Sequence, residues 1–240
     1  MKTIQQILHW SEVWSPLIPL AFYIVLRPKA RWVKPIVTFL LITLVFSIII
    51  DVIWKRKTLG INDWFESNLW WWWDTDPVSG KKIFKNNIFY NLNSFARLVF
   101  FLLFFSYFYP FFKKLSRLVP WVFLILMTIN FIWFENIKDF SSRQHALEAA
   151  ILLFCSLLYF YKTNMDDSVV SPSSLPEFRV VTGLTLYTAV NFFIFLFYKY
   201  LMGLPEFKKY ATDIWNVHNV SFIILNLFIA AAFIKAKKSE

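Results

Sequence analysis

The chain has 240 residues, of which 58% are hydrophobic and 21% aromatic, and it carries a formal net charge of +10. Charged residues make up only 17%, against roughly a quarter in soluble domains, and the apolar residues gather in long blocks, which excludes an ordinary soluble domain. No RRM, KH or zinc-finger signature accompanies the positive charge, so we do not expect the protein to bind nucleic acid. We expect the basic residues to lie at the ends of membrane-spanning helices instead.

Seven apolar blocks predict an all-α polytopic membrane protein with seven transmembrane helices in one domain. About 18 or more apolar residues cross a bilayer core of roughly 30 Å as a helix, which satisfies its own backbone hydrogen bonds. The fourth and fifth blocks are slightly short, and the alternative is that one of them is re-entrant or interfacial. The blocks are residues 8–26, 32–54, 88–109, 118–134, 146–161, 180–200 and 214–234.

The first helix carries His9 and Glu12 on one stripe with Pro16 and Pro19, at about 100° per residue. The proline pair is expected to kink this helix and to free backbone carbonyls. The second helix ends with Asp51, and a Trp-rich segment at about 55–86 follows it. Trp prefers the headgroup level, so this segment is interpreted as an interfacial anchor, with a lid or docking surface as the alternative.

The third helix opens with Asn87 and Asn91 and carries Arg97 deeper in the apolar block. Ionisable side chains inside a membrane helix are costly and mark functional or paired sites. Arg97 is expected either to pair with one of the acids of the neighbouring helices or to bind an anionic ligand. The candidate acids are Glu12, Asp51 and Glu148.

The remaining helices bring further polar groups to the same predicted membrane face. Because odd-numbered helices start at one face and even-numbered helices end there, these groups lie at one level in either orientation. Each stripe should face the bundle interior, which predicts a shared polar ligand pocket. The later helices contribute Glu135, His145, Glu148, Asn191, His218 and Asn219 to this set.

Basic residues near the helix ends predict an N-terminus outside and a C-terminus inside. Raw counts of Lys and Arg tie between the two faces, but half of those on the N-terminal face lie in the one long loop, 55–86. The short loops and the C-terminal tail therefore decide the orientation, and the pocket is predicted to face outward. Ten of the twelve Trp residues fall on that same outer side.

A metal site is an alternative use of the pocket. His9 and Glu12 repeat the i, i+3 spacing of His145 and Glu148, and imidazole and carboxylate groups suit Zn or Fe. The alternative is that each pair is hydrogen-bonded internally or to water. The hypothetical ligands are His9, Asp51, His145, Glu148 and His218.

Short motifs spread over most of the chain resemble an uncharacterised group of bacterial seven-helix membrane proteins, some encoded beside sensor histidine kinases. The resemblance implies a sensory or accessory role in the inner cell membrane. The group has an acidic residue near the position of Arg97, which argues against a function built on a carboxylate in the third helix. The motifs are Ser11-Glu12 with the following prolines, Asp51, NIFYN at 87–91, LLYFY at 157–161, PEF at 176–178, TGLTLY at 182–187 and IWNVHN at 214–219.

Three functions follow from these patterns. The first is a non-enzymatic signalling or accessory protein with an inner-side partner such as a sensor kinase. The second is a metal-dependent membrane hydrolase acting on lipids, since three His and an Asp near one face also resemble ceramidase-type enzymes. The paired His of their last helix is missing, and only His218 stands there. The third is a small-solute transporter, although no repeat is evident.

Overall fold

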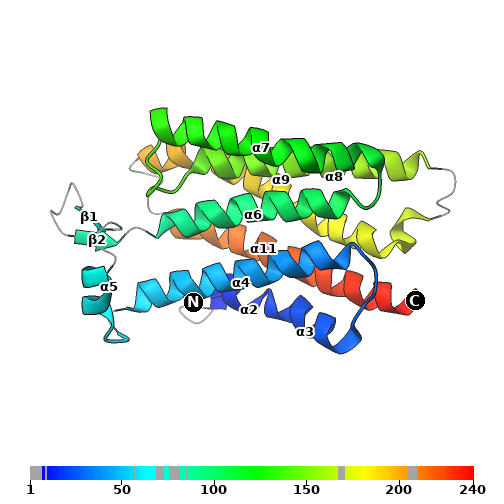
Figure 1. Ribbon diagram of the computed structural model, residues 1–240, viewed down its shortest axis with the longest axis horizontal. Coiled ribbons are helices and arrows are strands. Elements are labelled where there is room, and N and C mark those ends of the chain that lie inside the picture. The colour runs from blue at the N-terminus through cyan, green and yellow to red at the C-terminus, as the bar shows by residue number, and fades with distance from the viewer. Residues whose placement is uncertain are drawn as a thin grey trace.

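The structure is a computed structural model that describes residues 7–8, 10–56, 58–68, 73–75, 82–84, 86–166, 171–204 and 210–240. Within these ranges six helices are long and apolar enough to cross a membrane, and they run side by side along the long axis (Figure 1). The prediction of an all-helical, multi-pass membrane protein is confirmed. The six are α4 (Val33–Lys55), α6 (Asn87–Phe105), α7 (Pro110–Trp133), α8 (Ser142–Asn164), α9 (Pro176–Gly203) and α11 (Ala211–Lys238).

The first apolar block forms two short helices, α2 (Ser11–Trp14) and α3 (Leu17–Leu26). The break falls at Ser15 and Pro16, where the proline has no N–H to continue the helical ladder. From Ser11 to Leu26 a helix rises only about 24 Å at 1.5 Å per residue, less than the roughly 30 Å of a bilayer core. The described residues therefore establish six candidate spans, and the seventh remains a prediction.

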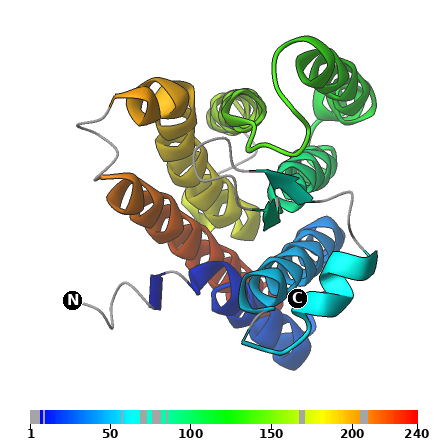
Figure 2. The same cartoon turned by 90° about the vertical axis from the view of Figure 1, so that its left-hand side faces the viewer.

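Helix α5 (Asn62–Asn68) and a two-stranded antiparallel hairpin lie at one end of the bundle (Figures 1 and 2). Strand β1 (Trp73–Thr75) pairs with β2 (Lys82–Phe84), with Trp73 opposite Phe84. The sequence did not predict this hairpin. Part of the predicted interfacial segment, including residues 69–72 and 76–81, lies outside the described residues.

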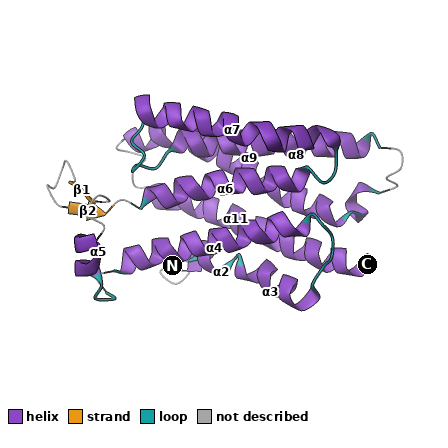
Figure 3. Cartoon of the chain, in the orientation of Figure 1, coloured by secondary structure: helices purple, strands orange, loops and turns teal. Residues whose placement is uncertain are grey.

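Local sequence explains where the long helices begin. Proline stands in the first turn of α7 and of α9, where a helix has no hydrogen-bond partner for the missing N–H. Helix α9 follows a short 3-10 helix, η2 (Pro172–Ser174). At the start of α8 the Ser141 hydroxyl accepts a hydrogen bond from the Gln144 N–H at 3.2 Å. Helices dominate the described chain (Figure 3).

Helix α9 packs between α8 and α11, while α6 contacts α4, α7 and α8. The half of the bundle away from α5 is filled by aromatic rings. Phe104 and Phe105 meet edge-to-face with centroids 5.3 Å apart, and Tyr159 joins them through Phe108 at 5.5 Å. Such pairs stabilise beyond their burial, so this half is a solid core and polar groups concentrate in the other half.

Gly183 allows α9 to approach α11 closely. A methyl group built on it would lie 2.6 Å from Cβ of Phe228 and 3.4 Å from Cα of Leu225. Because neither atom belongs to a flexible side-chain end, we expect Gly183→Ala to lower the free energy of unfolding by about 1–3 kcal/mol. Equilibrium unfolding in mixed micelles measures this effect, and a variant as stable as the wild type would contradict the close approach.

Candidate functional site: a polar cavity between the helices

Polar and aromatic side chains from six helices line one cavity in the half of the bundle nearer α5. The space open to the centre of a water-sized group is about 20 Å³, which is enough for one or two water molecules or groups of similar size. Four residues predicted for the pocket are brought together here, from α2, α6, α8 and α11. The lining residues are Glu12, Thr43, Tyr90, Asn93, Arg97, His145, Tyr187, Phe195, Trp215, His218 and Phe222.

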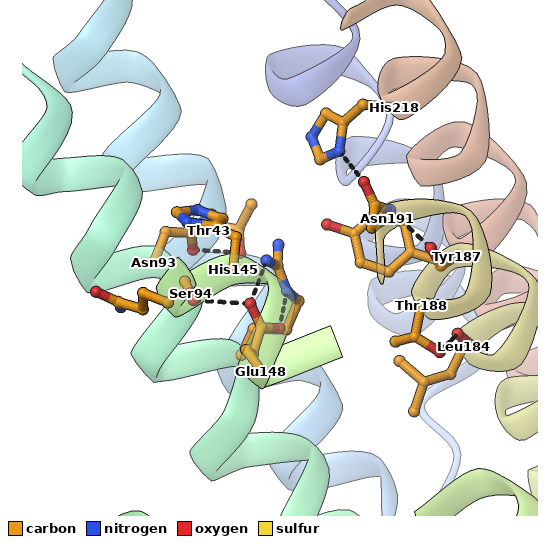
Figure 4. Close-up of polar contacts among 12 residues, drawn as sticks. Thr43, Asn93, Ser94, His145, Glu148, Leu184, Tyr187, Thr188, Asn191 and His218 are labelled. Atoms are coloured by element: carbon orange, nitrogen blue, oxygen red, sulfur yellow. Dashed lines mark hydrogen bonds and ion pairs between the residues drawn. The ribbon is translucent and has the colours of Figure 1, made fainter. Parts of the chain in front are cut away.

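Arg97 forms a buried, two-pronged ion pair with Glu148 (Figure 4). Arg97 Nε donates to Glu148 Oε1 at 2.5 Å, and Nη2 donates to Oε2 at 2.6 Å. The Ser94 hydroxyl adds a third donor to Oε2 at 2.7 Å. Paired N–H groups match the geometry of a carboxylate and make this a strong contact. Of the three acids considered from sequence, Glu148 is the one that holds Arg97.

Tyr187 covers the ion pair from α9, with its ring centroid 5.1 Å from the guanidinium carbon of Arg97. This distance allows a cation–π contact. The Tyr187 ring also lies 5.8 Å from the imidazole of His218. Tyr187 therefore connects the Arg97–Glu148 pair to the polar groups of α11.

The hydrogen bonds around His218 fix which ring nitrogen carries a proton. The Asn191 amide nitrogen donates to the carbonyl of Tyr187 at 2.7 Å and to the Ser221 hydroxyl at 3.2 Å. The Asn191 oxygen then faces His218 Nδ1 at 2.5 Å (Figure 4). Since that oxygen can only accept, Nδ1 must donate.

The other nitrogen of His218 faces α2, where Nε2 lies 3.6 Å from Glu12 Oε1. A neutral imidazole protonated at Nδ1 presents a lone pair at Nε2, which does not attract a carboxylate. The approach of Glu12 to His218 thus joins α2 to α11 at the cavity.

His145 is held from the α7–α8 connection. Its Nδ1 donates to the Ser141 carbonyl at 2.9 Å, because a carbonyl can only accept. Its ring stacks on Phe140, with centroids 4.6 Å apart, and lies 5.0 Å from that of Phe195. His145 Nε2 is therefore an acceptor in the wall of the cavity.

Asn87 and Asn91 were predicted to line the pocket, but they bind the connection between α7 and α8. The Asn91 amide donates to the Asp139 carbonyl at 3.0 Å and accepts from the Ser141 N–H at 3.2 Å. Asn87 donates to the Lys138 carbonyl at 3.3 Å. Helical spacing correctly placed both side chains on an interior face, but it could not show that a loop occupies that face.

Glu135 was also predicted for the pocket and lies instead in a separate groove. Its Oε2 accepts from the Ser141 hydroxyl at 2.6 Å and from Asn130 at 2.9 Å, and its Oε1 lies 3.6 Å from Lys199 Nζ. The groove is open to one side and has a volume of about 430 Å³. Its lining consists of Phe134, Glu135, Asn136, Asp139, Phe140, Ser142, Tyr198 and Lys199.

Asp51 and Asn219, also predicted for the pocket, serve contacts between helix surfaces. Asp51 pairs with Lys55 at 3.0 Å on the partly exposed end of α4, and Lys55 Nζ lies 3.3 Å above the Trp10 ring. Asn219 donates to the carbonyl of Leu8 at 3.1 Å. The Lys55–Trp10 and Asn219–Leu8 contacts fasten the segment around α2 to its neighbours.

The described part of the chain contains no cluster of side chains that could form the predicted metal site. Across those residues, no three His, Cys, Asp or Glu side chains lie close enough to hold one ion. Of the predicted ligands, Glu148 is bound by Arg97 and Asp51 by Lys55, while His145 and His218 line the cavity. The remaining predicted ligand, His9, lies outside the described residues.

Several lining residues were absent from the predicted set. Tyr90 and Tyr187 stand one or two helical turns from predicted residues on their own helices, so spacing could have identified them. Thr43 gives no such signal, because it is an isolated hydroxyl in an apolar block. It is found only through its hydrogen bond to Asn93 Oδ1 at 2.9 Å, between α4 and α6.

Comparisons with protein-family models, with curated proteins and with solved structures give no match to this chain. The functional argument therefore depends on the cavity and on the helices that form it.

Proposed function

We propose that this protein is a non-enzymatic signalling or accessory component of the inner cell membrane in a bacterium. In this proposal it has seven spans, with the N-terminus outside and the C-terminus inside. The state of its outward cavity is transmitted to a separate inner-side partner, such as a sensor kinase. The observation that carries the proposal is the convergence of side chains from six helices on one cavity, where Glu12 of α2 faces His218 of α11.

Helix α11 supplies the mechanical connection between the two ends of the bundle. It is continuous for 28 residues, about 42 Å at 1.5 Å per residue. Near its start it presents His218 to the cavity, and beyond its end Glu240 accepts a hydrogen bond from the Lys29 N–H of the α3–α4 connection. Lys235 also donates to the Ser173 carbonyl, just before α9, at 3.1 Å. A shift of α11 at the cavity must therefore alter contacts at the opposite end.

Basic side chains at that opposite end support its assignment to the inner face. The last turn of α11 carries Lys235, Lys237 and Lys238, and Lys and Arg accumulate on the cytoplasmic side of membrane proteins. The same residues offer a positively charged surface to an acidic segment of a partner. The short motifs shared with the bacterial group encoded beside histidine kinases agree with this role.

Spin labels at the inner end test whether the cavity controls it. In a Cys155→Ala background, labels at Arg31→Cys and Lys238→Cys report the separation of the α3–α4 connection from the end of α11. We expect Glu12→Gln, which removes the carboxylate facing His218, to move the mean label distance by about 1–2 Å, the usual scale of helix shifts. Double electron–electron resonance spectroscopy of the labelled protein in liposomes measures the distance between the two labels.

A label pair at Lys114→Cys and Lys162→Cys, on α7 and α8, is the matched control, because neither helix carries the Glu12–His218 pair. Its distance should stay constant when Glu12 is changed. If the distance from position 31 to position 238 is also unchanged by Glu12→Gln and by His218→Ala, the cavity does not communicate with the inner end and the proposal is wrong.

A further inference from the structure

The cavity wall contains hydrogen-bond donors that have no acceptor among the described residues. Arg97 uses Nε and Nη2 on Glu148, while Nη1 has no hydrogen-bond partner among the described residues. The guanidinium cannot lose its proton under ordinary conditions. Nη1 therefore presents two polarised N–H groups in the cavity wall, and a ligand that binds there must be an acceptor.

Tyr187 supplies a second and independent donor. Its side chain is 1% exposed, and its hydroxyl is buried with no hydrogen-bond partner in the described part of the chain. Figure 4 shows this hydroxyl pointing from α9 into the space before the Arg97–Glu148 pair. Buried hydroxyls almost always have a partner, so an unpaired one aimed into a cavity indicates that a ligand supplies the acceptor.

Asn93 completes the set one helical turn before Arg97. Its oxygen accepts from Thr43, which orients the amide and leaves Nδ2 without a partner in the described chain. The acid in the wall, Glu12, faces His218 rather than these donors. Three donors from α6 and α9 thus lie on one side of a space of about 20 Å³, whose wall also includes Glu12, His145 and His218.

We propose that this cavity binds a small monovalent anion, either a halide or the carboxylate end of a small acid, between Arg97, Asn93 and Tyr187. This inference deepens the proposed function by naming the ligand class of the signalling cavity. The cavity has room for about one or two water-sized groups, which favours a small ion. Halide and carboxylate share the same chemistry here, and the test separates them.

The buried thiol of Cys155 provides the readout. It reacts with a thiol-specific dye only after unfolding, because it is 1% exposed in the folded protein. Melting temperatures are compared in sodium chloride, acetate, sulfate and gluconate at equal ionic strength. A ligand that binds only the folded state stabilises it, so we expect chloride or acetate to raise the melting temperature by about 2 °C or more over gluconate. Sulfate stabilises folded proteins in general because it is excluded from their surface, so its effect should be the same in the wild type and in Tyr187→Phe. An increase with chloride alone identifies a halide, and one with acetate alone identifies a carboxylate.

Tyr187→Phe distinguishes binding from a structural role. In gluconate it should be at least as stable as the wild type, since it removes an unpaired buried hydroxyl. In the stabilising salt it should be less stable than the wild type, because it lacks a ligand contact. Tyr159→Phe is the control: Tyr159 is equally buried, but it packs against Phe105 and Phe108 outside the cavity and should retain the salt effect.

Equal melting temperatures in chloride, acetate and gluconate, or a Tyr187→Phe variant that keeps the full effect of chloride or acetate, would overturn anion binding. That result leaves the spin-label test of communication unaffected. Anion binding combined with unchanged label distances at the inner end would instead disprove the signalling proposal and retain the anion site.

Discussion

Replacing Glu148 with Ala is expected to lower the free energy of unfolding by about 3–5 kcal/mol. Glu148 is 1% exposed and binds the Arg97 side chain through both carboxylate oxygens. Its removal leaves a charged guanidinium in a membrane helix without its ion-pair partner. Equilibrium unfolding of purified protein in mixed micelles measures the loss.

Asp51→Ala is the matched control, because Asp51 also pairs with a basic residue but on a partly exposed helix end. Its side chain is 27% exposed and that of Lys55 is 39% exposed, so the loss should stay below about 1 kcal/mol. The double variant Arg97→Met with Glu148→Leu should recover most of the stability lost in Glu148→Ala. Equal losses for Glu148→Ala and Asp51→Ala would show that burial does not govern the Arg97–Glu148 pair.

The second large effect is expected for Asn91→Leu, which should lower the free energy of unfolding by about 2–5 kcal/mol. Leucine keeps the bulk of the side chain but removes the groups that bind the Asp139 carbonyl and the Ser141 N–H. Each buried polar group left unpaired costs roughly 1–3 kcal/mol. The α7–α8 connection would loosen, and with it the Ser141 carbonyl that orients His145. Unfolding equilibria give the size of the effect, and hydrogen exchange at residues 138–142 locates it.

Asn87→Leu provides the comparison one turn earlier on α6. Asn87 is half-buried and makes a single hydrogen bond of 3.3 Å to the same connection. Its replacement should cost no more than about 1 kcal/mol. If the two leucine variants are equally stable, Asn91 does not fix the connection as the structure indicates.

Membrane embedding could be predicted from sequence because it depends on composition along one dimension. Most of the apolar blocks are long enough to cross a bilayer by themselves, and the six long helices contain or closely overlap six of the predicted blocks. The first block differs because Pro16 and Pro19 lie within it, and the broken helix is too short by length alone to settle the seventh span. A hydropathy average over the block does not detect such a break, but the break interrupts the backbone hydrogen bonds of the helix.

The level of the polar residues in the membrane was also accessible from sequence, since helices alternate in direction. His145 and His218 were expected at one face, and the structure places both at one cavity. Their proton positions could not be predicted, because these follow from the Ser141 carbonyl and the Asn191 oxygen. Those acceptors come from other segments of the chain, and their approach depends on how the helices are rotated about their axes.

By itself the sequence determined that Arg97, Glu148, Asn91 and Asn87 face the interior of a helical bundle. Tertiary structure alone decided that Arg97 meets Glu148, that both asparagines hold a loop, and that Tyr187 is left with a free hydroxyl at a cavity. The physical reason is that helical periodicity is a local property of the chain, whereas the choice of partner depends on the relative depth and rotation of helices packed side by side.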